Sequence, residues 1–281
     1  MQTRLLRIPR LMATYAIVLA LGWSAAAQPA LAQSSPLQSS SAQPSTSQNS
    51  TAPDVSSPLP NAPEPHVTLR DLPRNLLHDQ AAIWTSPARL NSSNAAGPIV
   101  LVLGTTLLIT TDHQVMSSSR LINPSLNNHA VTASNGLIGG FLAAPAVFYG
   151  LGRIHHDNHA TETGILAGEA IGDSLVVNEV IKLISLRERP TVDDARGRFF
   201  QSGVGFNSSF PSNHAVVAWS AASVIASEYP GILTKITAYG LATGVSVARV
   251  VGREHFPSDV LVGSAVGWMI GRYVFHRHHH N

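Results

Sequence analysis

The sequence contains no cysteine among its 281 residues, which excludes disulfide bridges and thiolate chemistry. Lysine is nearly as scarce, because only Lys182 and Lys235 occur. Charged residues make up 12% of the chain and hydrophobic residues 44%, an apolar balance for a soluble protein. The length suffices for one large domain with a substantial core.

Acidic residues are absent from the first 32 positions, where Arg4, Arg7 and Arg10 precede an apolar run over residues 11–27. An Ala-Leu-Ala sequence ends at Ala32, and this pattern predicts a secretory signal peptide cleaved after it. An uncleaved N-terminal anchor is the alternative. Without this segment 15 basic residues oppose 16 acidic ones. We therefore expect an exported protein, periplasmic or associated with the cell envelope, whose near-neutral charge argues against a nucleic-acid partner.

The remaining chain divides by composition. Residues 33–65 are rich in Ser, Pro and Gln and are predicted to form a disordered linker. Residues 66–96 are predicted to form one or two short amphipathic helices that lie on the domain, with Trp84 packed against its core. Residues 97–276 are predicted to form the catalytic domain, and 277–281 are a His-rich tail.

Helical periodicity dominates from Gly97 onward, and no alternating strand pattern of any length competes with it. The chain is therefore predicted to be all-α, a bundle of about six core helices. Their expected ranges are 98–111, 133–151, 162–186, 214–227, 232–251 and 257–276. Glycine recurs at every fourth position in two of them, a spacing that lets neighbouring helices approach closely: Gly164, Gly168, Gly172, Gly263, Gly267 and Gly271.

Most of these helices are long enough to cross a membrane, which requires about 17–25 residues. If the chain starts outside the cell, however, three spans before Lys182 would place its site on the cytoplasmic side. The helix over 162–186 also carries Glu169, Asp173 and Glu179, which are costly in lipid unless they face the bundle interior. We expect a soluble or peripherally attached domain, with membrane association possible and the oligomeric state open.

Three blocks of polar residues interrupt the apolar helices. The first ends a helix with Lys182 and leaves it through Arg189, which Pro190 releases into a loop. Lys182 provides a point charge and Arg189 a planar fork for an anion. A lone lysine near a helix end is usually a snorkelling side chain, so this block is weak evidence by itself.

The second and third blocks each lie at a helix start. In the sequence Pro-Ser-Asn-His, Ser212 and Asn213 precede a helix that opens with His214, and free N–H groups at such a start bind anions. In the third block Arg249 is followed by His255 and by Asp259, whose carboxylate is placed to orient the imidazole. Three cations, two helix starts and two histidines together would suit a tetrahedral oxyanion.

The order Lys-x6-Arg-Pro, Pro-Ser-x-His and Arg-x5-His-x3-Asp resembles the type-2 phosphatidic acid phosphatase (PAP2) and vanadium haloperoxidase superfamily, bacterial acid phosphatases included. The resemblance covers residues 97–273 and departs from the usual pattern in two places. Asn213 stands where the family usually has glycine, and Ala248 where it usually has serine. We expect the backbone contact at Asn213 to survive and the loss of a hydroxyl at Ala248 to be tolerated.

The resemblance implies a role for each motif residue. His255 would attack phosphorus to form a phosphohistidine, with Asp259 orienting it. His214 would protonate the leaving oxygen and then activate water. The phosphate oxygens would be held by residues of all three motifs: Lys182, Arg189, Ser212, Asn213 and Arg249.

This chemistry requires no metal and no cofactor, and it predicts a phosphoric monoester hydrolase. Two alternatives remain: a membrane-associated phosphatase of lipid phosphates or pyrophosphates, and a haloperoxidase that holds vanadate in the same site. The expected partner is a phosphorylated small molecule or lipid. A non-catalytic anion-binding relative is disfavoured because both histidines and the aspartate are present.

Other polar residues receive plainer interpretations. His155, His156 and His159 are read as a solvated loop rather than as metal ligands. The C-terminal histidines at 276 and 278–280 form either a loose metal-binding tail or a disordered end. Three arginines between the first two blocks are interpreted as solvated loop charges that could line an entrance: Arg187, Arg196 and Arg198.

Overall fold

The computed structural model of the chain describes residues 67–279, so the predicted signal peptide and the linker over 33–65 lie outside the described residues. Within that range the chain forms seven α-helices, three short 3₁₀ turns and no strand, which confirms the predicted all-α class. The helices are α2 (Leu72–Thr85), α3 (Ala96–Met116), α4 (Pro124–His155), α5 (Asn158–Ser185), α6 (Asn213–Glu228), α7 (Ile232–Val251) and α8 (Pro257–His278).

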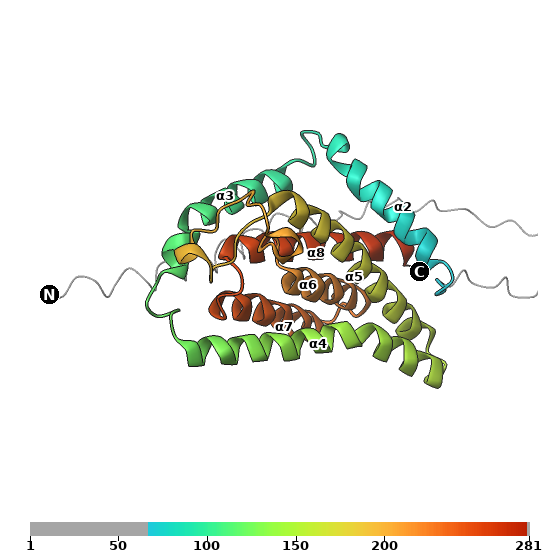
Figure 1. Cartoon of the computed structure of the whole chain (residues 1–281). Coiled ribbons are helices and arrows are strands. Elements are labelled where there is room, and N and C mark those ends of the chain that lie inside the picture. Colours follow the sequence, from blue (N-terminus) through green and yellow to red (C-terminus); the bar gives the residue numbers. More distant parts are fainter. Residues whose placement is uncertain (1–66, 280–281) are drawn as a thin grey trace, which may run out of the picture.

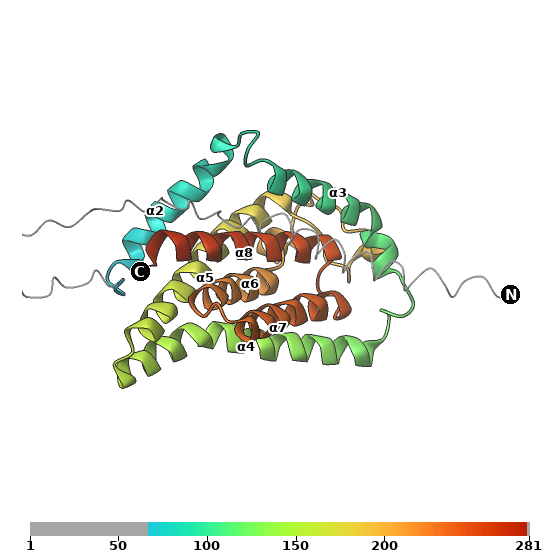
Figure 2. The same ribbon diagram turned by 180° about the vertical axis from the view of Figure 1, so that it is seen from behind.

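Helix α6 lies at the centre of the bundle and packs against α8, α5, α7 and α4. Its small side chains, Ala218, Ala221 and Ala222 among them, are fully buried in the largest apolar cluster. Helix α4 runs along one edge beside α5 and α7, while α3 and α2 lie on the opposite side over α8 and α5 (Figure 1). The reverse view shows the end of α8 beside α2 (Figure 2).

All six predicted core helices are present, but α3 and α4 are longer than predicted by more than one turn. Helix α4 begins at Pro124 rather than near residue 133, because the Asn123 side chain accepts a hydrogen bond from Leu126 N at 3.1 Å and caps the helix. Its first turns are polar and lack an apolar period. Helix α3 continues to Met116, where Asp112 and Met116 are buried. The extension of α3 contributes Asp112 to the candidate site.

The segment before the bundle differs from the prediction in one respect. Helix α2 packs on α5 as expected, and Ile83 contacts the core. Trp84, expected to pack inward, is 44% exposed, and its indole N–H donates to Gln80 on the same helix at 3.1 Å. The prediction for Trp84 was wrong because its aromatic size suggested burial, whereas the helix turns Ile83 toward the core instead.

The glycines of α8 allow its backbone to contact that of α6. A methyl group at Gly263 would lie 2.7 Å from the Ser212 carbonyl oxygen, and one at Gly271 would lie 2.5 Å from that of Ser220. In α5 only Gly164 is comparably close to a neighbouring backbone, that of α4. The glycine spacing therefore marks close helix packing in α8 and only at one position in α5.

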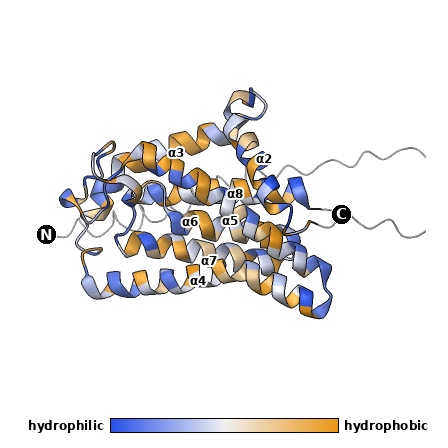
Figure 3. Cartoon of the chain, turned by 45° about the vertical axis from the view of Figure 1, so that its right-hand side comes forward, coloured by the Kyte–Doolittle hydropathy of each residue, from blue (hydrophilic) through white to orange (hydrophobic). Residues whose placement is uncertain are grey.

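Two helices, α3 and α4, are long and apolar enough to cross a membrane, and only 17% and 11% of their apolar windows are buried. Large apolar side chains of α3, such as Val102 and Leu103, are more than 60% exposed. Apolar stretches also lie along α7, where Leu233 is 76% exposed (Figure 3). The outer surface of these helices is thus unusually apolar.

One end of the bundle collects the polar motifs. The C-terminal ends of α5 and α7 and the N-terminal ends of α6 and α8 meet there, together with the end of α3 and the first half of α4. The loops over 186–212 and 252–256 close this end, on the left in Figure 1. Because helix direction alternates, three motifs far apart in sequence reach one place.

Candidate active site

The first motif places two cations at this end. Lys182 lies in the last turn of α5, is 2% exposed and donates from Nζ to the Ser208 carbonyl oxygen at 2.6 Å. Arg189 lies in the following loop and donates from Nε to the Asn207 side chain at 3.0 Å. Lys182 is therefore not a snorkelling surface lysine, since its ammonium group ends inside the protein.

Glu254 bridges the two arginines of the site. Its Oε2 atom lies 2.9 Å from Arg189 Nη1 and 3.1 Å from Arg249 Nη2. Arg249 also donates to Ser134 and Asn135 of α4, at 3.3 and 3.4 Å. The carboxylate thus holds both guanidinium groups in one place, in a position where a further anion would compete with it.

The second motif forms the start of α6. Ser212 is its N-cap residue, and its buried hydroxyl has no hydrogen-bond partner among the described residues. The side chain of Asn213 is tied back to α5: it donates to Glu179 at 2.6 Å and accepts from Asn178. Its amide group is therefore held by α5 through two contacts, and the helix start is free to present its N–H groups.

His214 follows in the first turn of α6. Its Nε2 atom lies 3.1 Å from Asn135 Oδ1, the same oxygen that Arg249 contacts. Burial is the main cause that lowers the pKa of His214 to about 4, and the charges of Arg249, His255, Arg189 and Lys182 lower it further. Through Asn135 and Glu254, His214 is linked by direct contacts to Arg249 and Arg189.

His255 lies in the short loop between α7 and α8 and is 2% exposed. Its Nδ1 atom is 2.7 Å from the Ser209 carbonyl oxygen and 3.7 Å from Asp259 Oδ2. Nδ1 therefore carries a proton, and in the neutral ring Nε2 is left unprotonated. Desolvation lowers the pKa of His255, opposed by Asp259, so the ring favours the neutral form.

Asp259 acts on His255 partly through Ser209. Its Oδ2 atom accepts hydrogen bonds from the Ser209 hydroxyl and from Phe256 N at 2.8 Å, and its Oδ1 atom accepts from Arg187. The sequence predicted a direct carboxylate–imidazole contact. The nearest acceptor is instead the Ser209 carbonyl group, which the carboxylate holds in position.

The sequence predicted Arg187 to be a solvated loop charge, and this prediction was wrong. It is 1% exposed and donates to Asp112 of α3 at 2.8 Å and to Asp259 at 2.6 Å. Its guanidinium group also lies over the rings of Phe199 and Phe256, 4.6 and 4.1 Å from their centroids. Burial with two carboxylates and two rings leaves it facing the protein interior, not an entrance.

Several contributors to this site were not predicted, among them Ser209, Glu254, Arg187, Asp112 and Asn135. Glu254 sits next to His255 in the third motif, so its charge was a visible signal. Nothing local in the sequence links Asp112 to Arg187, 75 positions away. Together with the predicted residues they form a site that can hold an anion and present an unprotonated imidazole nitrogen.

Two known proteins are similar to parts of this chain. Lipid A 1-phosphatase of Porphyromonas gingivalis is 34% identical over 77 residues, which cover 27% of this chain and 17% of that protein. The crystal structure of a transmembrane PAP2 type phosphatidylglycerolphosphate phosphatase from Bacillus subtilis aligns with a TM-score of 0.48 and 24% identity, over 64% of this chain and 94% of that one. The chain thus matches less than a fifth of the curated relative's length.

A model of the PAP2 superfamily matches residues 163–281. This range contains the end of α5, the loop with Arg189, the start of α6 and the whole of α8. All three polar blocks therefore fall inside one match, in the order that the resemblance required. Residues 163–281 of this chain are therefore similar to the PAP2 superfamily over the segment that carries the three motifs.

Proposed function

We propose that the protein is a phosphatase that hydrolyses phosphate monoesters through a phosphohistidine on His255. The observation that carries the proposal is a buried imidazole whose Nδ1 faces a carbonyl oxygen, beside two arginines that one carboxylate bridges and one of which shares the Asn135 oxygen with His214. The PAP2 match over the same residues supports it. A tetrahedral phosphate would replace the Glu254 carboxylate as a partner of Arg189 and Arg249.

The chemistry proceeds in two displacements. The Nε2 lone pair of His255 attacks phosphorus, the ester P–O bond breaks, and His214 in its protonated form donates a proton to the leaving oxygen. His214 then takes a proton from water, whose oxygen attacks phosphorus as the P–N bond breaks, which releases phosphate. Lys182, Arg189 and Arg249, with the N–H groups of the α6 start, neutralise the charge that builds on the equatorial oxygens.

A lipid-borne phosphate is the substrate class that the surroundings favour. An apolar groove of about 580 Å³ lies between α4, α6 and α7. It begins at Gly136, the residue after Asn135, which contacts both His214 and Arg249. From Gly136 to Ala144 the α4 wall extends about 12 Å. An acyl chain laid in this groove would bring its phosphate to the site.

The exposed apolar faces of α3 and α4 support the same class, because a lipid substrate must be taken from a membrane. The lipid phosphatase named among the relatives is consistent with it. We therefore propose an envelope protein that works in or on a membrane. The soluble domain predicted from the sequence is the competing arrangement.

The test compares an aryl phosphate with a phosphatidic acid in mixed micelles, using the full chain with and without a chelator. His255→Ala should abolish both activities, and acid-labile, alkali-stable ³²P should be trapped on the wild type only. Gly140→Leu would fill the groove, so it should reduce lipid hydrolysis and spare aryl phosphate. Gly150→Leu lies on α4 outside the groove and serves as the control.

The outcomes separate the proposals. If only the aryl phosphate is hydrolysed, the proposed phosphatase activity stands and the proposed lipid substrate is refuted. If His255→Ala keeps both activities, the phosphohistidine mechanism is refuted. Bromide oxidation by peroxide in added vanadate, with no phosphatase activity, would favour the haloperoxidase alternative.

A further inference from the structure

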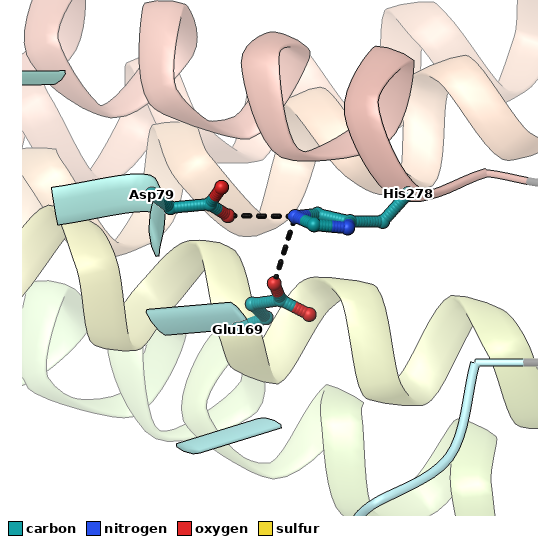
Figure 4. Close-up of side chains that lie close together, drawn as sticks. All are labelled: Asp79, Glu169 and His278. Atoms are coloured by element: carbon teal, nitrogen blue, oxygen red, sulfur yellow. Dashed lines mark hydrogen bonds and ion pairs between the residues drawn. The ribbon is translucent and has the colours of Figure 1, made fainter. Parts of the chain in front are cut away.

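At the end of the bundle opposite the candidate active site, three ionisable side chains from distant segments meet. Asp79 comes from α2, Glu169 from the first half of α5 and His278 from the last turn of α8 (Figure 4). We refer to these three residues as the distal cluster. His278 Nε2 lies 2.8 Å from Asp79 Oδ2 and 3.2 Å from Glu169 Oε1.

The distal cluster is buried, which separates it from ordinary surface charge. Asp79 is fully buried and Glu169 is 1% exposed, while the His278 side chain is 14% exposed. Of these three side chains, that of His278 is therefore the most exposed to solvent in the described part of the chain.

The described residues around the distal cluster include more carboxyl groups than basic side chains in contact with them. Asp173, one turn along α5 from Glu169, adds a third buried carboxylate whose charge acts on Glu169. Among the described residues, the ion pairs of Asp79 and Glu169 involve one basic side chain, that of His278. Buried carboxylates without a counter-charge are unfavourable, so a bound cation would stabilise their ionised form.

The two carboxylate oxygens of Glu169 have few partners. Neither of its carboxylate oxygens accepts a hydrogen bond of normal geometry among the described residues. Its contacts are the ion pair with His278 and the neighbouring Asn75 side chain. By contrast, Asp79 Oδ1 accepts from the Tyr273 hydroxyl at 3.0 Å, as outer partners of metal-ligating carboxylates do.

We propose that Asp79, Glu169 and His278 bind a divalent transition-metal ion such as Zn²⁺. Their three ligand atoms lie within 4.8 Å of one another. With metal–ligand distances of about 2.0–2.1 Å, a tetrahedral ion separates its ligand atoms by about 3.3 Å, so the two measured contacts need to open by no more than about 0.5 Å. One imidazole and two carboxylates suit zinc, manganese or iron, with water in the remaining positions.

The bound ion would join three elements rather than take part in the chemistry. Glu169 and Lys182 are 13 residues apart on α5, so the ion lies about 20 Å from the candidate active site. It would fasten α2 and the last turn of α8 to the first half of α5. The distal cluster is not visible in the sequence, because Asp79 and His278 are 199 positions apart and no local spacing connects them.

The test uses untagged full chain, stripped with a chelator and titrated with Zn²⁺ alone. We expect one equivalent to bind and to raise Tm, and an absorption-edge spectrum to show a single imidazole ligand. His278→Ala should weaken binding at least tenfold and abolish the rise in Tm. His276→Ala, which removes a histidine of the same helix that contacts Arg272, should change neither.

A second variant keeps the proposal testable if His278→Ala folds poorly. Glu169→Gln removes a buried charge, so it should raise Tm in the absence of metal and abolish the response to Zn²⁺. Equal losses in His276→Ala and His278→Ala would assign the metal to the C-terminal histidines in general. A lower metal-free Tm in Glu169→Gln would show that the protein itself already balances this carboxylate. Either result would overturn the proposal.

Discussion

Arg187 Nη1 lies 2.6 Å from Asp259 Oδ1, and both side chains are almost completely buried. The same guanidinium group reaches Asp112 at 2.8 Å, so it links α3 to the start of α8. Asp259 in turn holds the Ser209 carbonyl that orients His255. Through this chain of contacts, a residue that touches no substrate sets the orientation of the proposed nucleophile.

Replacing Arg187 should therefore be costly. Arg187→Met leaves two buried carboxylates without their cation, and we expect a loss of about 3–5 kcal/mol in the free energy of unfolding, measured by urea denaturation. Arg198→Met is the matched control, because Arg198 lies in the same loop with an exposed side chain paired to Glu188 and Asp193. Similar losses in both variants would contradict the buried-pair argument.

Removal of His214 should affect substrates according to their leaving groups. In the proposed mechanism its proton helps only when the departing oxygen is a poor leaving group. His214→Ala should therefore reduce kcat by roughly 10²–10⁴ for alkyl phosphates and much less for nitrophenyl phosphate. A series of aryl and alkyl esters gives the measurement. An equal loss across the series would count against an acid role for His214.

The free energy of unfolding should decrease at acidic pH, because the folded protein holds two histidines of the site in the neutral form. The pKa of His214 is lowered to about 4, mainly by burial, against an ordinary value of about 6.5 in the unfolded chain. Between these values the unfolded state binds the extra proton, so stability decreases as pH falls from 6.5 toward 4. The lowered pKa of His255 acts in the same direction.

Thermal denaturation of wild type and His214→Gln between pH 4.5 and 7.5 checks this pH dependence. The variant has no proton to gain at this position, so its Tm should improve relative to wild type as the pH falls. Added phosphate should reduce the difference, because an anion raises the pKa of the ring. Parallel pH profiles for the two proteins would show that His214 titrates normally.

Glu254 should limit anion affinity at the candidate site, since its carboxylate occupies both Arg189 and Arg249. Glu254→Gln keeps an acceptor oxygen and removes the charge. Competition by orthovanadate should therefore strengthen by about threefold to tenfold. Glu188→Gln, which changes a partner of Arg198, should leave inhibition unaltered. Weaker inhibition in Glu254→Gln would instead mean that Glu254 mainly orders the arginines.

The glycines of α8 should be intolerant of a methyl group. At Gly267 it would meet the backbone of Val216 and lie 3.0 Å from Ser220 N, so Gly267→Ala should destabilise by more than about 2 kcal/mol. Gly240→Ala in α7 has open space around it and should be neutral or stabilise by up to about 1 kcal/mol. Chemical denaturation of both variants measures the contrast.

The sequence predicted the all-α class and the residues of the three motifs because both depend on local patterns. Helical period and the Lys-x6-Arg-Pro spacing are visible within a few turns of chain. The contact between Arg187 and Asp112 depends on how α3 packs over α8, which no local pattern reveals. Trp84 was misplaced for a related reason: apolar character alone does not say which face of α2 meets the core.

The two ends of helix α8 contact different parts of the protein. Asp259 in its first turn faces Arg187, and His278 in its last turn faces Asp79. One residue inserted between them would rotate the distal half by about 100° and advance it by about 1.5 Å. Only one end could then keep its contacts. The length of α8 is therefore constrained as strictly as its composition. Insertions or deletions should accumulate in the loops of the protein rather than within this helix.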